Sequence, residues 1–70
     1  MPKIIIKNSE LIRSQMLKKG YNLKELGLLC GVSHSYISIV INGKRNPSGK
    51  LSKKILDSLD LKFDDIFFTS

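Results

Sequence analysis

The stretch NLKELGLLCGVSHSYISIVINGKR, from Asn22 to Arg45, decides the fold of this chain. Asn22 is a good helix N-cap, and Glu25 stands three residues later, at the capping-box position. Gly31 offers the positive φ that ends a helix, and Ser33 is a second N-cap directly afterwards. Two caps eleven residues apart therefore predict two short helices joined by a tight turn.

Apolar residues support both helices. Leu23, Leu26 and Leu29 recur at helical spacing in the first, and Asn42-Gly43 provides a stop for the second. The hydrophobic-staple positions around the two caps hold Tyr21 with Leu26 and Val32 with Ile37.

Gly27 is unusual inside the first of these helices, because glycine there costs about 1 kcal/mol relative to alanine. A very small residue is needed where two helices cross steeply over a short turn. We therefore expect the second helix to press on Gly27.

The spacing of Gly27, Gly31 and Ile37 resembles the DNA-binding helix-turn-helix of the phage Cro and repressor family, also called the Xre family. The loop NGKRNPS at residues 42–48 and the segment LDLKFDDIF at residues 59–67 are also similar to that family. The resemblance implies an all-α, lambda-repressor-like DNA-binding domain of four to five helices, which acts as a sequence-specific transcriptional regulator.

The charge of the chain is unevenly distributed. Its 70 residues, which we expect to form a single domain over residues 1–70, carry a formal net charge of +6. Residues 57–70 hold four aspartates and one lysine, which leaves 11 basic against two acidic groups in residues 1–56. A basic body with an acidic end fits one surface facing DNA and another turned away from phosphate. Lysines that merely keep a small protein in solution would explain the charge equally well, and the motif favours DNA.

Other classes of function find little support. No apolar run approaches the ~20 residues needed to cross a bilayer, so we expect a cytoplasmic protein that does not engage membranes. The single cysteine, Cys30, is typical of a small buried hydrophobe, and with His34 it supplies only two of the four ligands of a structural zinc site. Asp64-Asp65, one histidine and several serines form no catalytic constellation. We expect no metal, no cofactor and no enzymatic activity.

The flanking segments predict the remaining elements. Residues 9–19 are expected to form a first helix capped by Asn8 or Ser9, and Ser48 or Pro47 opens a fourth helix. The expected inner faces consist of Leu11, Ile12 and Met16 in the first helix and Leu51, Ile55, Leu56 and Leu59 in the fourth.

The two ends of the chain are both β-prone. We expect a helical turn over residues 63–65 and a strand over residues 66–69, which pairs with residues 4–6 in a small two-stranded sheet. The alternative is a frayed N-terminus with the C-terminal aromatics in a helical core. In either arrangement Phe67 or Phe68 is exposed and suggests a dimer surface.

Projection of the second motif helix at 100° per residue separates an apolar inner arc from an outer arc. In the family that the chain resembles, the N-terminal half of this helix reads the major groove. The candidate base-reading residues are His34, Ser35, Ser38 and Ile39. His34 also fits a solvated position at a helix start, and without Arg, Gln or Asn in the first turn the expected specificity leans on DNA shape.

Phosphate contacts are expected around the reading helix, from the backbone N–H groups of Leu23 and Lys24 and from Asn42, Lys44 and Arg45. For Tyr36, core packing and a phosphate hydrogen bond are comparable alternatives. The chain departs from the family in two places. The family that the chain resembles usually has a glutamine that hydrogen-bonds DNA where this chain has Leu23. Many of its members also pair a buried arginine with a glutamate at the positions of Met16 and Ile41.

The expected partner is double-stranded DNA with a pseudo-palindromic operator, bound by a homodimer that represses by occupying the site. The alternative is an antitoxin or another protein-binding module with the same fold, which neutralises a protein partner through its acidic, aromatic C-terminal end.

Overall fold

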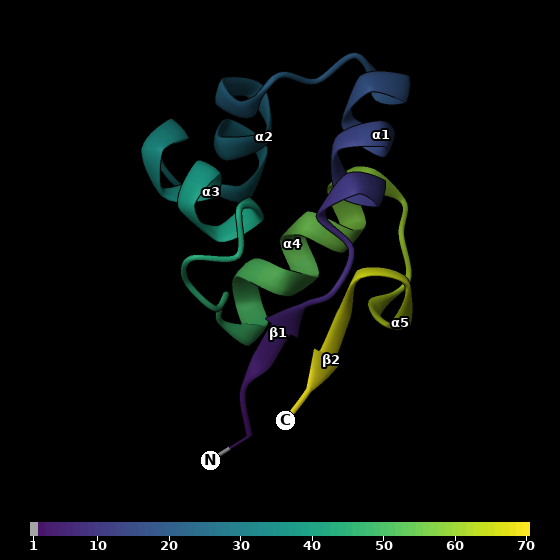
Figure 1. Ribbon diagram of the computed structural model, residues 1–70. Coiled ribbons are helices and arrows are strands. Elements are labelled where there is room, and N and C mark those ends of the chain that lie inside the picture. Colours follow the sequence, from purple (N-terminus) through teal and green to yellow (C-terminus); the bar gives the residue numbers. More distant parts are fainter. Residues whose placement is uncertain (1) are drawn as a thin grey trace.

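A computed structural model describes residues 2–70 (Figure 1). Over this range the chain forms five helices and a sheet of two short strands, in agreement with the predicted architecture. The elements in chain order are β1 (Ile4–Ile6), α1 (Ser9–Lys19), α2 (Leu23–Cys30), α3 (His34–Ile41), α4 (Gly49–Leu59), α5 (Phe63–Ile66) and β2 (Phe67–Thr69).

Local capping chemistry sets the bounds of α1. Of the two predicted caps, Asn8 is used, and its side chain accepts a hydrogen bond from the Leu11 amide at 3.1 Å. Ser9 instead donates through its hydroxyl to the Ile41 carbonyl at 2.8 Å, which connects the start of α1 to the end of α3. Gly20 ends the helix with a φ of 76°.

The start of α4 is equally well defined. The Ser48 side chain accepts from the Leu51 amide at 3.1 Å, so Ser48 is the N-cap. The buried Ser52 donates back to the Ser48 carbonyl at 2.8 Å and thereby satisfies its own hydroxyl inside the core. The predicted inner face is confirmed, since Leu51, Ile55 and Leu59 are buried and Leu56 packs partly buried against them.

The two ends of the chain meet in an antiparallel sheet, as predicted (Figure 1). Ile5 lies opposite Phe68, and Ile6 lies opposite Phe67. Because side chains alternate along a strand, Phe67 is fully buried while Phe68 is 43% exposed. β2 begins one residue later than predicted, because Ile66 still belongs to the last turn of α5.

The core forms one continuous cluster to which every helix and β2 contribute. Its buried apolar members are Ile12, Met16, Leu26, Cys30, Ile37, Val40, Ile41, Leu51, Ile55, Leu59, Ile66 and Phe67. Met16 and Ile41, at the positions where the resemblance implies a buried arginine–glutamate pair, are 6% and 1% exposed. An apolar pair at these positions avoids the desolvation that a buried ion pair requires.

The apolar spacing of Leu23, Leu26 and Leu29 does not coincide with the buried face of α2. Leu29 is 51% exposed, and the buried residues are Leu26, Gly27 and Cys30. At 100° per residue, Gly27 and Cys30 lie to one side of Leu26 and Leu29 lies to the other. The buried face of α2 therefore includes Gly27, which neighbouring backbone approaches closely, and Cys30, while Leu29 lies beside this face.

The sheet register generates a stability prediction. Ile6 packs against the core and Ile5 does not. Ile6→Ala should lower the free energy of unfolding by about 1–2 kcal/mol, which corresponds to a fall in melting temperature of roughly 5–15 °C. Ile5→Ala is the matched control and should cost less than about 1 kcal/mol, because only a cross-strand pair is removed. Thermal unfolding followed by circular dichroism measures both, and equal effects would contradict this register.

Candidate nucleic-acid interface

The N-terminus of α2 carries a complete capping box. The Asn22 side chain accepts from the Glu25 amide at 2.8 Å, and the Glu25 carboxylate accepts from the Asn22 amide at 3.1 Å. The first two helical amides, those of Leu23 and Lys24, have no carbonyl to bind within the helix. They lie at its positive end, where an anion is favoured.

The turn between α2 and α3 is held at very close range. A Cβ on Gly27 would lie 2.9 Å from the Val32 carbonyl oxygen and 3.4 Å from the carbonyl carbon and oxygen of Ser33. The Val32 amide in return donates to the Gly27 carbonyl at 2.9 Å. The expectation that α3 itself presses on Gly27 was therefore wrong in detail. The backbone of the turn folds back onto this position before α3 begins.

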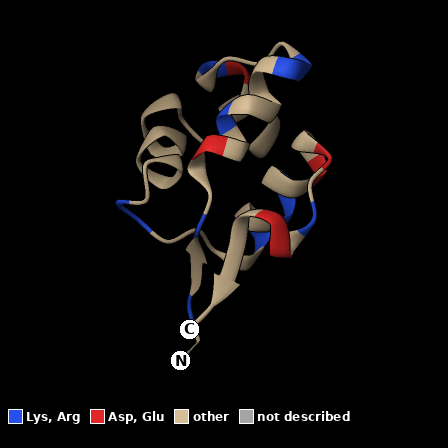
Figure 2. Cartoon of the chain, turned by 45° about the vertical axis from the view of Figure 1, so that its right-hand side comes forward, with Lys and Arg blue, Asp and Glu red and all other residues tan. Residues whose placement is uncertain are grey.

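Ser33 is the N-cap of α3, and its hydroxyl accepts from the Tyr36 amide at 3.1 Å. The outer arc predicted by the helical projection is largely exposed, and the predicted inner arc is largely buried. His34, Ser35, Ile39 and Asn42 are exposed, Ser38 is half-buried, and Ile37, Val40 and Ile41 are buried. The helix contains no charged residue and lies at one side of the molecule in two views (Figures 1 and 2). Any compensation of phosphate charge must therefore come from its neighbours.

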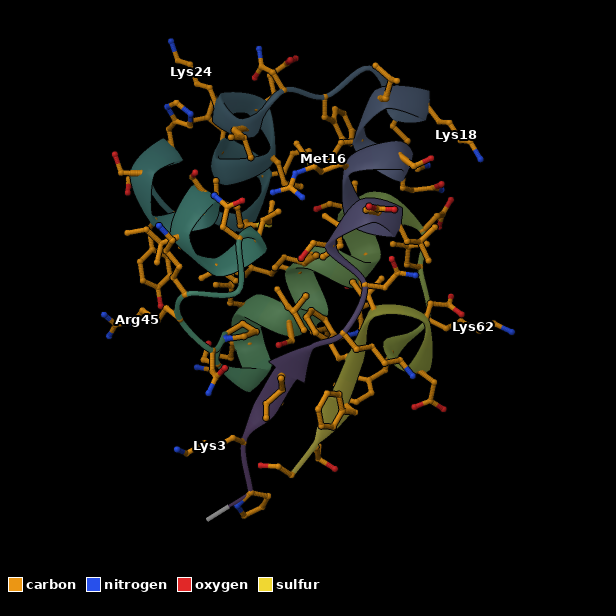
Figure 3. The ribbon with its side chains drawn as sticks, in the orientation of Figure 1. Lys3, Met16, Lys18, Lys24, Arg45 and Lys62 are labelled. Atoms are coloured by element: carbon orange, nitrogen blue, oxygen red, sulfur yellow. The ribbon has the colours of Figure 1, made fainter. Side chains whose placement is uncertain are left out.

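Cationic side chains flank α3 at two places. Lys24 and Arg45 project on the side of the molecule where α3 lies, whereas Lys18 and Lys62 project from the other side (Figure 3). The Arg45 guanidinium lies over the Tyr36 ring, 5.6 Å from its centroid. Tyr36 also packs against the core cluster, so this ring both anchors α3 and supports the arginine of the following loop.

Sequence reasoning assigned no role to Arg13, which reaches this surface from α1. Its Nη2 atom donates a hydrogen bond to Oδ1 of Asn42, the C-cap of α3. The contact joins residues 29 positions apart. The only feature of the sequence that could have indicated this contact is the position of Arg13, one helical turn before Met16 on α1.

A hollow of about 310 Å³ opens between α1, the start of α2 and α3. Met16, Leu23 and Ile41 supply apolar lining, and Arg13 with Asn42 contributes polar groups. The hollow therefore lies beside the amides at the start of α2 and beside the outer arc of α3. Its complete lining is Arg13, Met16, Leu17, Tyr21, Asn22, Leu23, Ser38, Ile41 and Asn42.

The four C-terminal aspartates lie elsewhere. In Figure 2 the acidic segments at the end of α4 and in α5 lie away from α3. Asp60 pairs with Lys19 at 3.2 Å and Asp57 pairs with Lys53 at 3.5 Å, so two of the four C-terminal aspartates bind cations of α1 and α4. The fold therefore shows the segregation of charge predicted from the sequence, with the acidic end remote from α3.

Cys30 is 2% exposed, and burial raises the pKa of its thiol, while Ser58 and Lys54 act in the opposite direction. The thiol is therefore protonated at neutral pH and packs as a small apolar group. Within residues 2–70, no group of three or more His, Cys, Asp or Glu side chains lies close enough to hold a metal ion. The helices of that range are also too short or too polar to cross a membrane.

The fold and the geometry of α2 and α3 define a helix-turn-helix protein, and comparison with known proteins agrees. The helix-turn-helix family HTH_3 matches residues 12–66. YvzC of Bacillus subtilis, described as an uncharacterized HTH-type transcriptional regulator, is 36% identical over 59 residues, which cover 84% of this chain and 77% of YvzC.

Solved structures give the same assignment. The N-terminal DNA-binding domain of SinR from Bacillus subtilis aligns with a TM-score of 0.68 and 32% identity, covering 80% of this chain and 83% of that domain. SinR, the master regulator for biofilm formation, in complex with DNA aligns with a TM-score of 0.69 and 30% identity, covering 83% and 94%. The chain belongs to the Xre family of Cro/C1-type helix-turn-helix proteins. It is a DNA-binding transcriptional regulator, and the relatives that it matches are transcription regulators.

The contact at Gly27 generates a prediction with an internal control. Gly27→Ala should lower the free energy of unfolding by about 1–3 kcal/mol, because the new methyl group meets backbone that has little room to move. Gly49, at the start of α4, has no atom within 4 Å of its Cβ position, so Gly49→Ala should be neutral or stabilise by up to ~1 kcal/mol. Urea unfolding compares the two variants. Equal effects would show that the turn does not rest on Gly27.

Proposed function

We propose that this regulator is a repressor, which occupies a pseudo-palindromic operator as a homodimer with the outer arc of α3 in the major groove. The observation that carries the proposal is the arrangement around α3. An exposed, uncharged helix face is flanked by cations at Lys24 and Arg45 on the same side of the molecule. The relation to SinR, whose structure is known in complex with DNA, supports the same orientation.

The proposed base-reading residues act through short contacts. Ser35 and Ser38 exchange hydrogen bonds with base edges, and Ile39, which is 42% exposed, contacts a thymine methyl group. His34 is exposed at the first position of α3, where it reaches a base or a phosphate. None of these side chains makes the bidentate contact of an arginine or a glutamine, so DNA shape contributes to specificity.

Two groups of residues hold the phosphates in this proposal. The amides of Leu23 and Lys24 bind one phosphate at the positive end of α2. Lys44, Arg45 and Asn42 bind another from the end of α3 and the loop that follows, with Tyr36 as the platform beneath Arg45. These contacts position the protein on the duplex and carry no direct sequence information.

The outer face of the small sheet is the proposed dimer surface. Phe68 is 43% exposed there and lies opposite Ile5. A two-fold contact through this end places two copies of α3 about 34 Å apart, one turn of DNA, with the acidic segments away from phosphate. A dimer gripping an operator excludes other proteins from it, and repression follows from occupancy.

A matched pair of variants tests the proposed phosphate contacts. Arg45→Ala should weaken binding to every duplex to a similar degree and should reduce the slope of log affinity against log salt by about 0.9 for each phosphate that is no longer neutralised. Lys62→Ala removes the same charge from the opposite side of the molecule and should change neither quantity by as much. Fluorescence anisotropy of labelled operator duplexes over a range of salt measures both. Equal effects would mean that α3 and its flanks do not face DNA.

A further inference from the structure

A relay of two hydrogen bonds connects α1 to the proposed reading helix. Arg13 Nη2 donates to Asn42 Oδ1, and Asn42 Nδ2 donates to Ser38 Oγ at 3.4 Å. An arginine side chain carries donors and no acceptor, so the amide oxygen of Asn42 must face it. The amide nitrogen then faces Ser38. Arg13 therefore determines which way the Asn42 amide is turned.

This orientation constrains the hydroxyl of Ser38. A serine hydroxyl has one hydrogen to donate and two lone pairs that accept. The Asn42 amide occupies one lone pair, and the hydrogen is then available to a group outside the protein. Ser38 is half-buried on the outer arc and lines the hollow beside α1, so its surroundings limit the directions in which that hydrogen can point.

We propose that Arg13 is a positioning residue which, through Asn42, sets the Ser38 hydroxyl as a donor to an acceptor on a base edge in the major groove. The inference rests on the proposed function, because it assumes that α3 enters the groove. The acceptors there are purine N7, guanine O6 and thymine O4, whereas the edge of cytosine offers only its N4 donor. At the base contacted by Ser38, cytosine is therefore the disfavoured choice.

The surroundings of the relay favour this role over a loose surface contact. Beneath Arg13, Met16 and Ile41 are buried and apolar, so neither competes for the guanidinium. Asn42 is also held through its main chain, because its amide donates to the Ser38 carbonyl at 3.0 Å. Both hydrogen bonds of the relay are exposed to solvent, and the charge of the Arg13 donor makes its hydrogen bond stronger than one between neutral groups.

The experiment first locates the contacted base. Fluorescence anisotropy measures the affinity of the full chain for a selected operator duplex and for duplexes that differ from it at one base pair. The base pair at which Ser38→Ala no longer discriminates is the one that Ser38 reads. There the wild type should prefer an acceptor base over cytosine by roughly 2- to 13-fold, the range expected of one hydrogen bond.

Arg13→Met then tests the relay, since methionine keeps an apolar stem over the hollow but donates no hydrogen bond. Its preference at that base pair should fall to the level of Ser38→Ala, and the double variant should show no further decrease. Lys18→Met removes the same charge from an exposed site on α1 that points away from α3, and it should retain the wild-type preference.

For a third variant we predict that the base preference at the contacted position is reversed. Asn42→Asp keeps an acceptor for Arg13 but has no hydrogen to donate, so the Ser38 hydroxyl turns to donate to the new carboxylate and presents a lone pair to DNA. Overall affinity falls because of the added negative charge, while the preference at the contacted base moves toward the donor groups of cytosine and adenine.

The outcomes separate this inference from the proposed function. If Arg13→Met weakens all duplexes equally and keeps the wild-type preference, Arg13 is a simple electrostatic contact and the inference is wrong. If the wild type binds no duplex, the proposed function fails and the inference fails with it. If the wild type binds but Ser38→Ala changes no preference, Ser38 is not a reader and the inference alone is wrong. Thermal unfolding of each variant verifies that a reduced preference does not reflect a loss of fold.

Discussion

The close approach of the turn to Gly27 is the constraint on which the rest of this structure depends. A carbonyl oxygen occupies the space that a side chain would fill, 2.9 Å from the Cβ position. Gly31 takes the positive φ that lets the chain reverse there, and the caps Asn22 and Ser33 set the starts of α2 and α3. Because these contacts determine how α3 leaves the turn, they also determine which of its faces is exposed.

The contacts between α1 and α3 show how this chain differs from the family pattern. The positions of a buried ion pair hold Met16 and Ile41, which pack without the cost of desolvating charges. A polar connection between the same two helices is present at the edge of the molecule, between Arg13 and Asn42. Charge is thus kept out of the core and placed where α3 and the proposed phosphate contacts meet.

Much of the fold was predictable because its causes are local. Capping boxes, glycine stops and β-prone ends act over a few residues, and the predicted caps and strand pairing are confirmed. The exposure of Leu29 was not predictable from spacing, since three-residue periodicity does not show which side of a short helix meets its neighbours. The Arg13 contact with Asn42 joins residues 29 apart, and no local pattern encodes such a contact. The DNA-binding roles of individual residues remain predictions.

The most direct test of the proposed DNA-facing surface is a map by NMR chemical-shift perturbation, with a selected operator duplex titrated into the labelled chain. We predict the largest backbone amide shifts at residues 23–24, at residues 34–39 and in the loop at residues 44–45. The backbone amides of residues 60–65 should shift least, because this acidic segment does not contact DNA in the proposed orientation. Largest shifts in residues 60–65, with α3 unchanged, would contradict the proposed orientation on DNA.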